Sequence, residues 1–578
     1  MKLSALALDY DGTIAVNGAL DPSVRAAIAD LRRQGIVVVL ATGRRLADLN
    51  GVAGDLACFD VIVAENGAVL SFPDSKRHAT LAHAPNQMFL DELRRRNVDF
   101  TAGECIIEAD ASAASTMLEV IRTLQVPLTL TFNRSRLMVL PQAVAKSTGL
   151  RQALRALRVS IHNTVAIGDA ENDHDLLDVC EVGAAVEWGS SALRATADEV
   201  VHGSGPEAVA AYMRRLVEQP RLSAAQMGRR RLVLGYEHDG TEVSLAVRGR
   251  TILVAGEPGT GKSWLAGLLC EQLILQGYCV CVVDPEGDYR ALAALPDVVM
   301  LGGDEPPPSA RELARTLEHP DVSVVIDLSR LPHREKVGYV STLMPLLVTM
   351  RRRTGLPHKI LLDEAHYFLA DADHTRMIDP ELAGYIVVTY HLSALDPAIR
   401  ENGDAVTLVT RETDPDEVTT LLGMCRPLPS SADSKHLFRD LQSNEAALLP
   451  GAAESPGAIR RFRLIPRLTA HVRHRTKYVD MPVADSRAFV FAEGGRPGPH
   501  ARTLREFTAL LSQLPPDRLS GHLHRHDYSR WIDDVFRDRP LALRIRTLES
   551  RIVCDGASDV AGAIAQTIRA RYETADAA

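Results

Sequence analysis

The chain has 578 residues, of which 46% are hydrophobic and 24% are charged. This length is too great for a single hydrophobic core and the composition is too apolar for a disordered chain, so we expect several globular domains. No apolar run approaches the roughly 18 to 20 residues that cross a bilayer, and acidic residues interrupt the N-terminal apolar stretch, which predicts a cytoplasmic protein with no membrane partner.

Eight cysteines are scattered along the chain without any CxxC pair. Their spacing predicts reduced, mostly buried thiols rather than disulfides or a zinc ribbon. The net charge of -9 is unevenly distributed, because basic residues outnumber acidic ones only after residue 456. Only that last part would attract a polyanion through its charge alone.

The first 217 residues alternate short apolar runs with amphipathic stretches, the pattern of a parallel α/β sheet. Asp21 followed by Pro22 predicts the start of a helix, as an N-cap and a proline in the first turn. Between about residues 72 and 141 the pattern weakens into a small helix-and-strand unit. Strands are predicted at Leu3–Leu8, Ile36–Leu40, Val61–Ala64 and Val165–Ile167.

Reactive side chains follow several of these runs. Asp9 and Asp11 end the first predicted strand, Thr42 ends the second, and Lys146 precedes a helical stretch. Another strand ends in a segment that contains Asp169 and Asp173. A hydroxyl, an ammonium group and paired carboxylates at strand ends indicate a magnesium-dependent phosphoryl-transfer site, although any one of them could also be a helix cap or turn residue.

Taken together, these motifs resemble the haloacid dehalogenase superfamily of phosphatases, subclass IIB, whose Cof-like and phosphoglycolate phosphatase-like members carry a cap inserted between the second and third motifs. The segments that carry the resemblance are ALDYDGT (7–13), ATGR (41–44), AENGA (64–68), AKSTGL (145–150) and IGDAENDHDLL (167–177). The resemblance covers residues 1–217, with the cap at about 72–141. Because caps select substrates, it implies a small phosphorylated metabolite, with a sugar phosphate or phosphoglycolate as the default.

The resemblance also implies a role for each site residue. Asp9 would attack phosphorus to form an aspartyl-phosphate, and Asp11 would protonate the leaving oxygen and then activate water. Thr42 would hold a phosphate oxygen and Lys146 would neutralise charge. The residues implied for Mg²⁺ are Asp9, Asp11, Asp169 and Asp173.

A second α/β pattern extends over residues 228–450. A hairpin is predicted around Asp239-Gly240, followed by buried strands at 251–255, 279–283, 324–327, 360–363 and 385–389. The first of these strands leads into GEPGTGKS (256–263) and then a helical stretch, which is the context of a P-loop. The pattern therefore predicts a nucleotide-binding unit with ATP and Mg²⁺ as cofactors.

In this P-loop Gly256, Gly259, Thr260 and Gly261 would let backbone N–H groups approach the phosphates. Lys262 would reach the β and γ oxygens, and Ser263 would ligate Mg²⁺. About a hundred residues later a strand ends in Asp363 and Glu364. Asp363 would support the magnesium ion and Glu364 would polarise the attacking water.

The segments LGYEHDGTEVSLAV (234–247), VDPEGDY (283–289), ILLDEAHYF (360–368) and VVTYHLSAL (387–395) resemble the HerA and FtsK group of ATPases. One departure is Tyr390, where relatives commonly have a glutamine that senses the γ-phosphate. The resemblance implies a possible homo-oligomer, a hexameric ring, in which Arg411 or Arg400 could complete a neighbour's site or be plain surface residues.

The C-terminal part, residues 456–578, is predicted to be a basic accessory domain. Seven arginines and lysines between Arg460 and Lys477 form either a groove for nucleic acid or phosphate, or a face that packs on the acidic ATPase domain. His522, His524 and His526 alternate as on a strand or straddle a turn. Without cysteines or a second ligand pair we interpret them as surface or hydrogen-bonded residues rather than a zinc site.

We therefore expect a Rossmann-like haloacid dehalogenase domain with a small α/β cap, a RecA/HerA-like P-loop domain, and a small accessory domain. The predicted function is a Mg²⁺-dependent phosphomonoester hydrolase joined to an ATP-hydrolysing domain. Two alternatives stay open. One is a HerA-like DNA translocase with an attached nucleotide phosphatase, and the other is an ATP-driven assembly machine whose phosphatase fold serves as a sensing domain.

Overall fold

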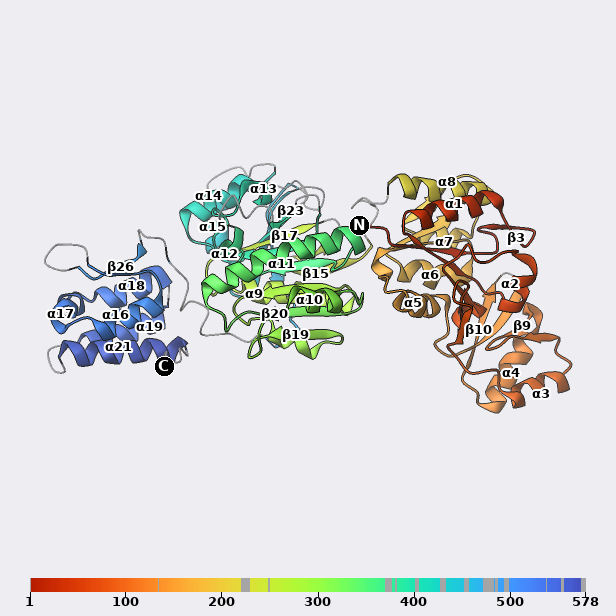
Figure 1. The fold of residues 1–578 in the computed structure, drawn as a ribbon, viewed down its shortest axis with the longest axis horizontal. Helices are drawn as coiled ribbons and strands as arrows, with labels where there is room; N and C mark the ends of the chain where they lie inside the picture. Colours follow the sequence, from red (N-terminus) through yellow and green to blue (C-terminus); the bar gives the residue numbers. More distant parts are fainter. Residues whose placement is uncertain are drawn as a thin grey trace.

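The computed structural model describes residues 2–133, 135–219, 229–247, 250–369, 377–379, 382–400, 405–426, 433–451, 457–470, 483, 487–492, 498–536, 538–551 and 556–572. Three units lie in a row, with an N-terminal α/β unit at one end, a second α/β unit in the middle and a helical unit at the other end (Figure 1). Among the described residues no helix has the length and apolar character needed to span a membrane. The seven described cysteines are free thiols, as predicted.

A mixed sheet with helices packed around it forms the N-terminal unit. Its central strands are fully buried and parallel, which explains why they read as continuous apolar runs in the sequence. In spatial order the strands are β14 (Glu199–Val201), β13 (Val182–Val186), β12 (Thr164–Gly168), β1 (Ala5–Asp9), β4 (Val37–Ala41), β5 (Val61–Ala64), β6 (Val69–Phe72) and β7 (Arg77–Thr80). The helices are α1 (Pro22–Arg33), α2 (Leu46–Val52), α5 (Lys146–Ala156), α6 (His174–Val179), α7 (Ser191–Thr196) and α8 (Gly205–Glu218).

Helix α1 begins as its sequence predicts. The side chain of Asp21 accepts a hydrogen bond from the backbone N–H of Ser23, and Pro22 occupies the first turn. The buried face of α1 consists of Val24, Ala27, Ile28 and Leu31, which lie in the main core of this unit.

A small cap is inserted between the core strands. Because β6 and β7 still pair with the core sheet, the cap begins after Thr80, later than the predicted residue 72. The cap comprises β8 (Phe100–Ala102), β9 (Ile107–Asp110), β10 (Leu128–Asn133) and β11 (Arg136–Pro141) with α3 (Gln87–Arg95) and α4 (Ala114–Leu124). One face of its sheet packs on α3 and α4, and the opposite face carries Met138 toward the core unit.

The middle unit contains a larger sheet, parallel at its centre. In spatial order its strands are β16 (Glu242–Ala246), β15 (Arg231–Tyr236), β25 (Arg460–Leu464), β24 (Glu445–Leu448), β23 (Ala405–Val409), β17 (Thr251–Ala255), β22 (Tyr385–Thr389), β21 (Lys359–Leu362), β18 (Val280–Asp284), β20 (Ser323–Asp327) and β19 (Val298–Gly302). Its helices are α9 (Lys262–Leu275), α10 (Ala310–Leu317), α11 (His333–Thr354), α12 (His366–Leu369), α13 (Pro397–Arg400), α14 (Pro415–Met424) and α15 (Asp433–Arg439).

Strand β25 belongs to this sheet although the sequence places it in the C-terminal part, after residue 456. It pairs antiparallel with both β24 and β15. Two of its arginines bind carboxylates of the middle unit. Arg460 Nε donates at 2.5 Å to Glu237, which follows β15, and Arg461 Nε donates at 3.1 Å to Glu445 of β24. The described arginines therefore support packing on the ATPase unit, whereas Arg473, Arg475 and Lys477 lie outside the described residues.

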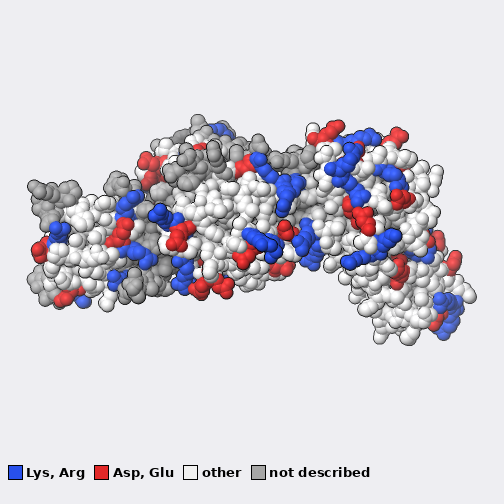
Figure 2. All heavy atoms as spheres, in the orientation of Figure 1, with Lys and Arg blue, Asp and Glu red and all other residues white. Residues whose placement is uncertain are grey.

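The C-terminal unit is mainly helical. Its elements are β26 (Phe489–Val490), β27 (His500–Ala501), α16 (Leu504–Gln513), α17 (Pro516–His524), α18 (Asp527–Phe536), α19 (Arg539–Glu549) and α21 (Ala557–Tyr572). Trp531 and Ile532 lie in its core. On the face drawn in Figure 2, described acidic and basic side chains are interspersed over all three units.

The first two units meet at a buried polar interface. His162 and Glu181 of the N-terminal unit contact Tyr278 of the middle unit, and all three residues are almost completely buried. Tyr278 Oη donates to Glu181 at 2.8 Å and its ring stacks on His162 with centroids 3.8 Å apart. His358 Nε2 donates to Asn163 Oδ1 at 2.9 Å. These residues immediately precede β12, β13, β18 and β21, so the N-terminal ends of strands from both sheets meet here.

Candidate functional sites

The first candidate site lies where β1, β4 and β12 end. Asp9 ends β1, Thr42 follows β4, and Asp169 follows β12. The parallel pairing of β1 with β4 and β12 brings these ends to one edge of the sheet. Lys146 opens α5 and is completely buried. The sequence-predicted residues Asp9, Thr42, Lys146, Asp169 and Asp173 are all nearly or fully buried at this edge.

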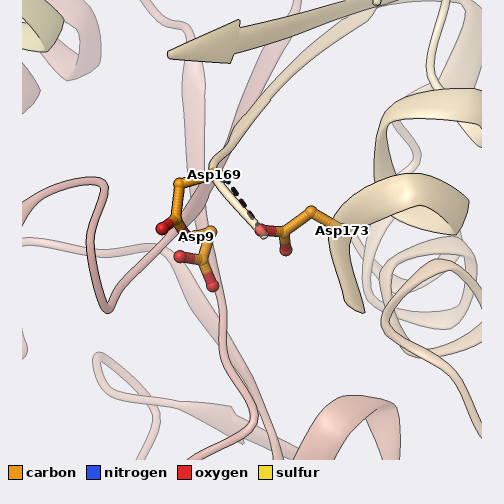
Figure 3. Close-up of side chains that lie close together, drawn as sticks. All are labelled: Asp9, Asp169 and Asp173. Atoms are coloured by element: carbon orange, nitrogen blue, oxygen red, sulfur yellow. Dashed lines mark hydrogen bonds between the residues drawn. The ribbon is translucent and has the colours of Figure 1, made fainter. Parts of the chain in front are cut away.

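Three carboxylates gather in this site around a single ammonium group. Oxygens of Asp9, Asp169 and Asp173 lie within 4.8 Å of one another (Figure 3). Lys146 Nζ donates to Asp9 Oδ1 at 2.5 Å and to Asp173 Oδ1 at 2.6 Å. Because buried negative charge exceeds buried positive charge here, this oxygen-rich group fits a hard divalent cation such as Mg²⁺.

The electrostatics of the cluster shift two ionisable groups. Burial and the nearby Asp173 carboxylate raise the pKa of Asp9 well above its usual value, although Lys146 acts in the opposite direction. Burial alone would lower the pKa of Lys146, but Asp173 and Asp9 hold it above its ordinary value. Lys146 therefore stays charged, and an additional cation would favour the ionised form of Asp9.

Two further contacts hold the reactive groups. Thr13 Oγ1 donates to Asp9 Oδ2 at 3.1 Å, so both oxygens of Asp9 are oriented. Thr42 Oγ1 accepts the backbone N–H of Arg44 at 3.1 Å, which leaves its own O–H available to a ligand oxygen.

Asp11 lies outside the carboxylate cluster, unlike the sequence-based expectation that it would also hold the metal. Arg44 Nε and Nη2 donate to its two oxygens at 2.7 and 2.6 Å. A bidentate guanidinium is a strong, directional partner, and it fixes the carboxylate beside the site. Among the described residues the group with metal-ligand geometry is Asp9, Asp169 and Asp173.

Sequence reasoning assigned no role to Arg44 or Glu65. The Glu65 carboxylate accepts backbone N–H groups of Glu104, Cys105 and Ile106 at 2.8 to 3.2 Å. Those residues lie immediately before the cap strand β9, so Glu65 ties the cap to the core. The contact is next to Thr42, whose carbonyl accepts the N–H of Asn66. The signal was present in the AENGA segment, but its partners lie about forty residues away.

The second candidate site lies at the end of β17. Gly256 has a φ of +143°, and a Cβ there would stand 2.1 Å from Thr410 Oγ1, so only glycine fits. Thr260 Oγ1 is 2.7 Å from Thr410 Oγ1, which ties the loop to the end of β23. Lys262 and Ser263 open helix α9, and Lys262 Nζ donates to the carbonyl of Glu257 at 3.0 Å.

The acidic pair predicted by the sequence ends the nearby strand β21. Asp363 and Glu364 are almost completely buried. Strand β22 lies between β17 and β21, so the pair is two strands, roughly 10 Å, from the P-loop along the same sheet edge. His366 Nδ1 is 3.2 Å from Thr389 Oγ1 at the end of β22. The structure thus brings both halves of the predicted nucleotide site to one edge.

Tyr390, the departure noted in the sequence, follows β22. Its ring centroid is 5.9 Å from Lys262 Nζ and 4.3 Å from the ring of His366. Arg411 Nε donates to Glu257 at 2.7 Å, so this candidate finger contacts the P-loop of its own chain. Arg400 ends helix α13.

The three C-terminal histidines have separate partners. His522 Nδ1 is 2.9 Å from Asp527, His524 Nδ1 is 2.8 Å from the Ser520 carbonyl oxygen, and His526 Nδ1 is 3.2 Å from Glu549. The segment is the end of helix α17 and the turn after it, rather than a strand. The histidines are thus hydrogen-bonded, as interpreted from the sequence.

Comparison with known families agrees with this division. The family model described as haloacid dehalogenase-like hydrolase matches residues 6–101 and 76–213, and the model described as helicase HerA, central domain, matches residues 233–342. The chain joins a haloacid dehalogenase-like hydrolase domain to a HerA-type P-loop ATPase domain. The predicted mixed α/β fold class is therefore confirmed.

Curated relatives resemble the hydrolase domain. A phosphoglycolate phosphatase of Methanothermobacter thermautotrophicus is 26% identical over 222 residues, which cover 37% of this chain and 99% of the relative. A phosphoglycolate phosphatase of Halorubrum lacusprofundi is 29% identical and aligns with 34% of this chain and 91% of its own length. A solved haloacid dehalogenase-like hydrolase from Bacteroides thetaiotaomicron, 18% identical, aligns with 37% of this chain and 100% of its own, with a TM-score of 0.33.

Proposed function

We propose that the chain is a bifunctional enzyme in which a Mg²⁺-dependent phosphomonoester hydrolase is joined to a Mg²⁺- and ATP-dependent P-loop ATPase. The observation that carries the hydrolase half is the convergence of Asp9, Thr42, Lys146 and Asp169 at one sheet edge. The ATPase half is supported by two features at one edge of the second sheet: the P-loop follows β17, and Asp363 and Glu364 follow β21.

In the proposed phosphatase reaction an Asp9 oxygen forms a bond to phosphorus while the bond from phosphorus to the leaving oxygen breaks. Protonated Asp11, once released from its contact with Arg44, gives its proton to that oxygen. The resulting carboxylate later takes a proton from the water whose oxygen bonds to phosphorus as the bond from phosphorus to Asp9 breaks. Lys146 keeps Asp9 oriented and balances negative charge, and Thr42 donates its O–H to a phosphate oxygen. Asp9, Asp169 and Asp173 would hold Mg²⁺, which supplies charge stabilisation to the transferring phosphoryl group.

For the substrate we propose a small phosphorylated metabolite, with phosphoglycolate or a small sugar phosphate as the first candidates. The relatives named above support this choice. The cap face toward the core also carries polar side chains, because Glu108 lies on the same face as Met138 and accepts from Arg136 Nη2 at 2.6 Å. Arg45 Nε of the core lies 3.9 Å from Glu108. These charges suit a substrate with polar groups beyond its phosphate.

The phosphatase proposal is tested by phosphate release from a panel of phosphomonoesters with and without Mg²⁺. Asp9→Asn should abolish release while it leaves ATP hydrolysis unchanged. Lys262→Ala is the matched control, because it changes the other site and should leave phosphatase turnover intact. Phosphatase activity that survives in Asp9→Asn would reject the assignment.

For the ATPase half, backbone N–H groups of residues 256–261 and Lys262 would bind the phosphates of ATP. Ser263 and Asp363 would hold Mg²⁺, and Glu364 would orient the attacking water. Glu364→Gln should retain ATP binding but lose hydrolysis, whereas Lys262→Ala should lose both. Equal hydrolysis in the wild type and in Lys262→Ala would exclude this assignment.

A second candidate function is a ring-forming DNA translocase, which the match to the central domain of helicase HerA favours. It predicts that duplex or single-stranded DNA stimulates ATP hydrolysis and that the chain forms a closed ring. Sizing combined with light scattering, and ATPase assays with and without DNA, distinguish the candidates. If the protein is a monomer and DNA does not change its rate of ATP hydrolysis, the translocase is excluded and the bifunctional enzyme remains the proposed function.

A further inference from the structure

An open hollow of about 840 Å³ lies on the ATPase domain and has no role in the sites described above. Its walls come from the end of β15, the start of β24 and the end of β25, with Tyr236, Glu445, Arg461 and Arg463 among its lining residues. The volume falls within the roughly 300 to 1,000 Å³ of small-molecule and cofactor pockets. The hollow is therefore large enough for the nucleoside part of a nucleotide.

The register of the strands places this hollow beside the P-loop. Strand β17 ends at the P-loop, and the parallel strand β23 ends at the same edge. Strand β24 runs antiparallel to β23 and therefore begins at this edge, where Glu445 pairs with Arg463 and Arg463 pairs with Tyr236. The carbonyl oxygen of Ser443, two residues before Glu445, lies 3.7 Å from where a Cβ on Gly261 would stand.

The side of the P-loop on which the hollow lies is the one that a nucleoside needs. On the other side of β17 are β22 and β21, which end in Thr389 and Asp363. Under the proposed ATPase function these residues face the γ-phosphate and its Mg²⁺. The phosphate chain then points toward β21, so the sugar and base leave the P-loop over β23, β24 and β25, where the hollow opens.

We propose that this hollow binds the nucleoside half of ATP, with adenine stacked on Tyr236 and the ribose and inner phosphate beside Arg463. This assignment rests on the proposed ATPase function. Tyr236 is 47% exposed and lines the hollow, so its ring is accessible to a base. Arg463 is exposed, whereas Arg461 is held by Glu445 at 3.1 Å and forms a fixed wall.

The experiment compares Mg²⁺-ATP with Mg²⁺-tripolyphosphate, which has the phosphates but no nucleoside, by calorimetric titration of the full-length protein. Tyr236→Ala should weaken ATP binding about tenfold, in line with the loss of one base–aromatic stack, and leave tripolyphosphate affinity unchanged. Tyr236→Phe is the matched control, because it keeps the ring and should keep wild-type affinity for both ligands.

The outcomes separate this inference from the proposed function. If Lys262→Ala weakens the binding of both ATP and tripolyphosphate while Tyr236→Ala changes the affinity for neither, the nucleoside assignment is wrong and the ATPase assignment stands. If Lys262→Ala leaves the affinity for both ligands unchanged, the ATPase assignment itself fails. Binding of a thymidine oligonucleotide that is lost in Tyr236→Ala, with ATP affinity unchanged, would overturn the inference in favour of a single-stranded nucleic acid site.

Discussion

Glu181→Gln is expected to separate the unfolding of the hydrolase domain from that of the ATPase domain. Glu181 accepts from Tyr278 Oη at 2.8 Å and from His162 Nδ1 at 3.0 Å, and its side chain is about 1% exposed. Arg230 Nε lies 3.7 Å from the same carboxylate oxygen. His162 Nε2 lies 2.9 Å from the carbonyl oxygen of Gln276. Both ring nitrogens of His162 face acceptor oxygens, and a doubly protonated imidazole would donate to each of them. Glu181 is thus the buried counter-ion of an interface between domains.

The size of the effect follows from this geometry. Removal of one partner from a buried ion pair costs about 3 kcal/mol, or roughly a hundredfold in the docking equilibrium, because the remaining charge has no compensation. Glutamine keeps the shape of Glu181 and one acceptor oxygen, so neither packing nor the Tyr278 contact is removed. The loss should therefore appear in the interface rather than within either domain.

The chain provides its own probes, since its three tryptophans, Trp188, Trp264 and Trp531, lie in the three different units. Variants that keep a single tryptophan, with phenylalanine at the other two positions, report the thermal unfolding of each unit by fluorescence. Trp188 and Trp264 should report coincident transitions in the otherwise wild-type chain. With Glu181→Gln the two transitions should separate by several degrees.

The matched control is Glu199→Gln. Glu199 also accepts from a tyrosine and an arginine, Tyr212 at 3.0 Å and Arg215 at 3.1 Å, but all three lie within the hydrolase domain. This control should lower the Trp188 transition without changing the cooperativity between domains. Coincident transitions that persist in Glu181→Gln, or transitions that are already separate without it, would refute the reasoning.

Three further predictions concern the two sites. Burial and adjacent carboxylates raise the pKa of Asp9, so the stability that comes from its protonated form is complete below about pH 3.8 and is lost as the pH rises through the raised pKa. Mg²⁺ should therefore raise the unfolding temperature reported by Trp188 more at pH 7.5 than at pH 5. An equal rise at both pH values would contradict this. Glu412 follows Arg411, which contacts the P-loop. Burial raises the pKa of Glu412 from 4.5 to about 7, so the stabilisation from its protonated form is lost as the pH rises through that range. Glu412→Gln should therefore raise the unfolding free energy at pH 8 by roughly 3 kcal/mol and leave it unchanged at pH 4. Gly67→Ala should reduce phosphatase activity, because the added Cβ would stand 1.9 Å from the backbone oxygen of Ala145, just before Lys146. Gly35 also has a positive φ but has open space around it, so Gly35→Ala is the control and should cause backbone strain alone. Equal phosphatase activity in both variants would count against a steric role for Gly67.

The sequence predicted the sheets and both phosphate-handling sites because their signals are local. Buried parallel strands such as β1 and β17 are continuous apolar runs, and the reactive residues follow directly at their ends. Strand β25 lacks that signal, because three of its five residues are arginine and only Phe462 is buried. The carboxylates that its arginines bind, Glu237 and Glu445, lie outside the strand, and Glu237 is 223 positions earlier in the chain than Arg460. Its membership in the sheet depends on pairing rather than on its own pattern.

The interface between the domains could not be predicted from the sequence either. Its contacts join residues about one hundred to two hundred positions apart, such as Glu181 with Tyr278 and Asn163 with His358. Each residue by itself looks like an ordinary polar position before a strand. The same limit applies to Arg44, whose role becomes visible only when the fold brings its guanidinium to Asp11.

The position of this interface constrains any communication between the two reactions. Strands β12, β18 and β21 begin at the interface, and the catalytic candidates Asp169 and Asp363 follow the opposite ends of β12 and β21. The cap, which covers the phosphatase site, lies on the side of its domain that faces away from the ATPase domain (Figure 1). With strands of about five residues on each side, the sites are on the order of 30 Å apart. Phosphate or nucleotide released at one site would have to travel that distance to reach the other. Any coupling through the fold would pass through the contacts between the two units, which include His162 with Tyr278 and Arg155 with Asp321.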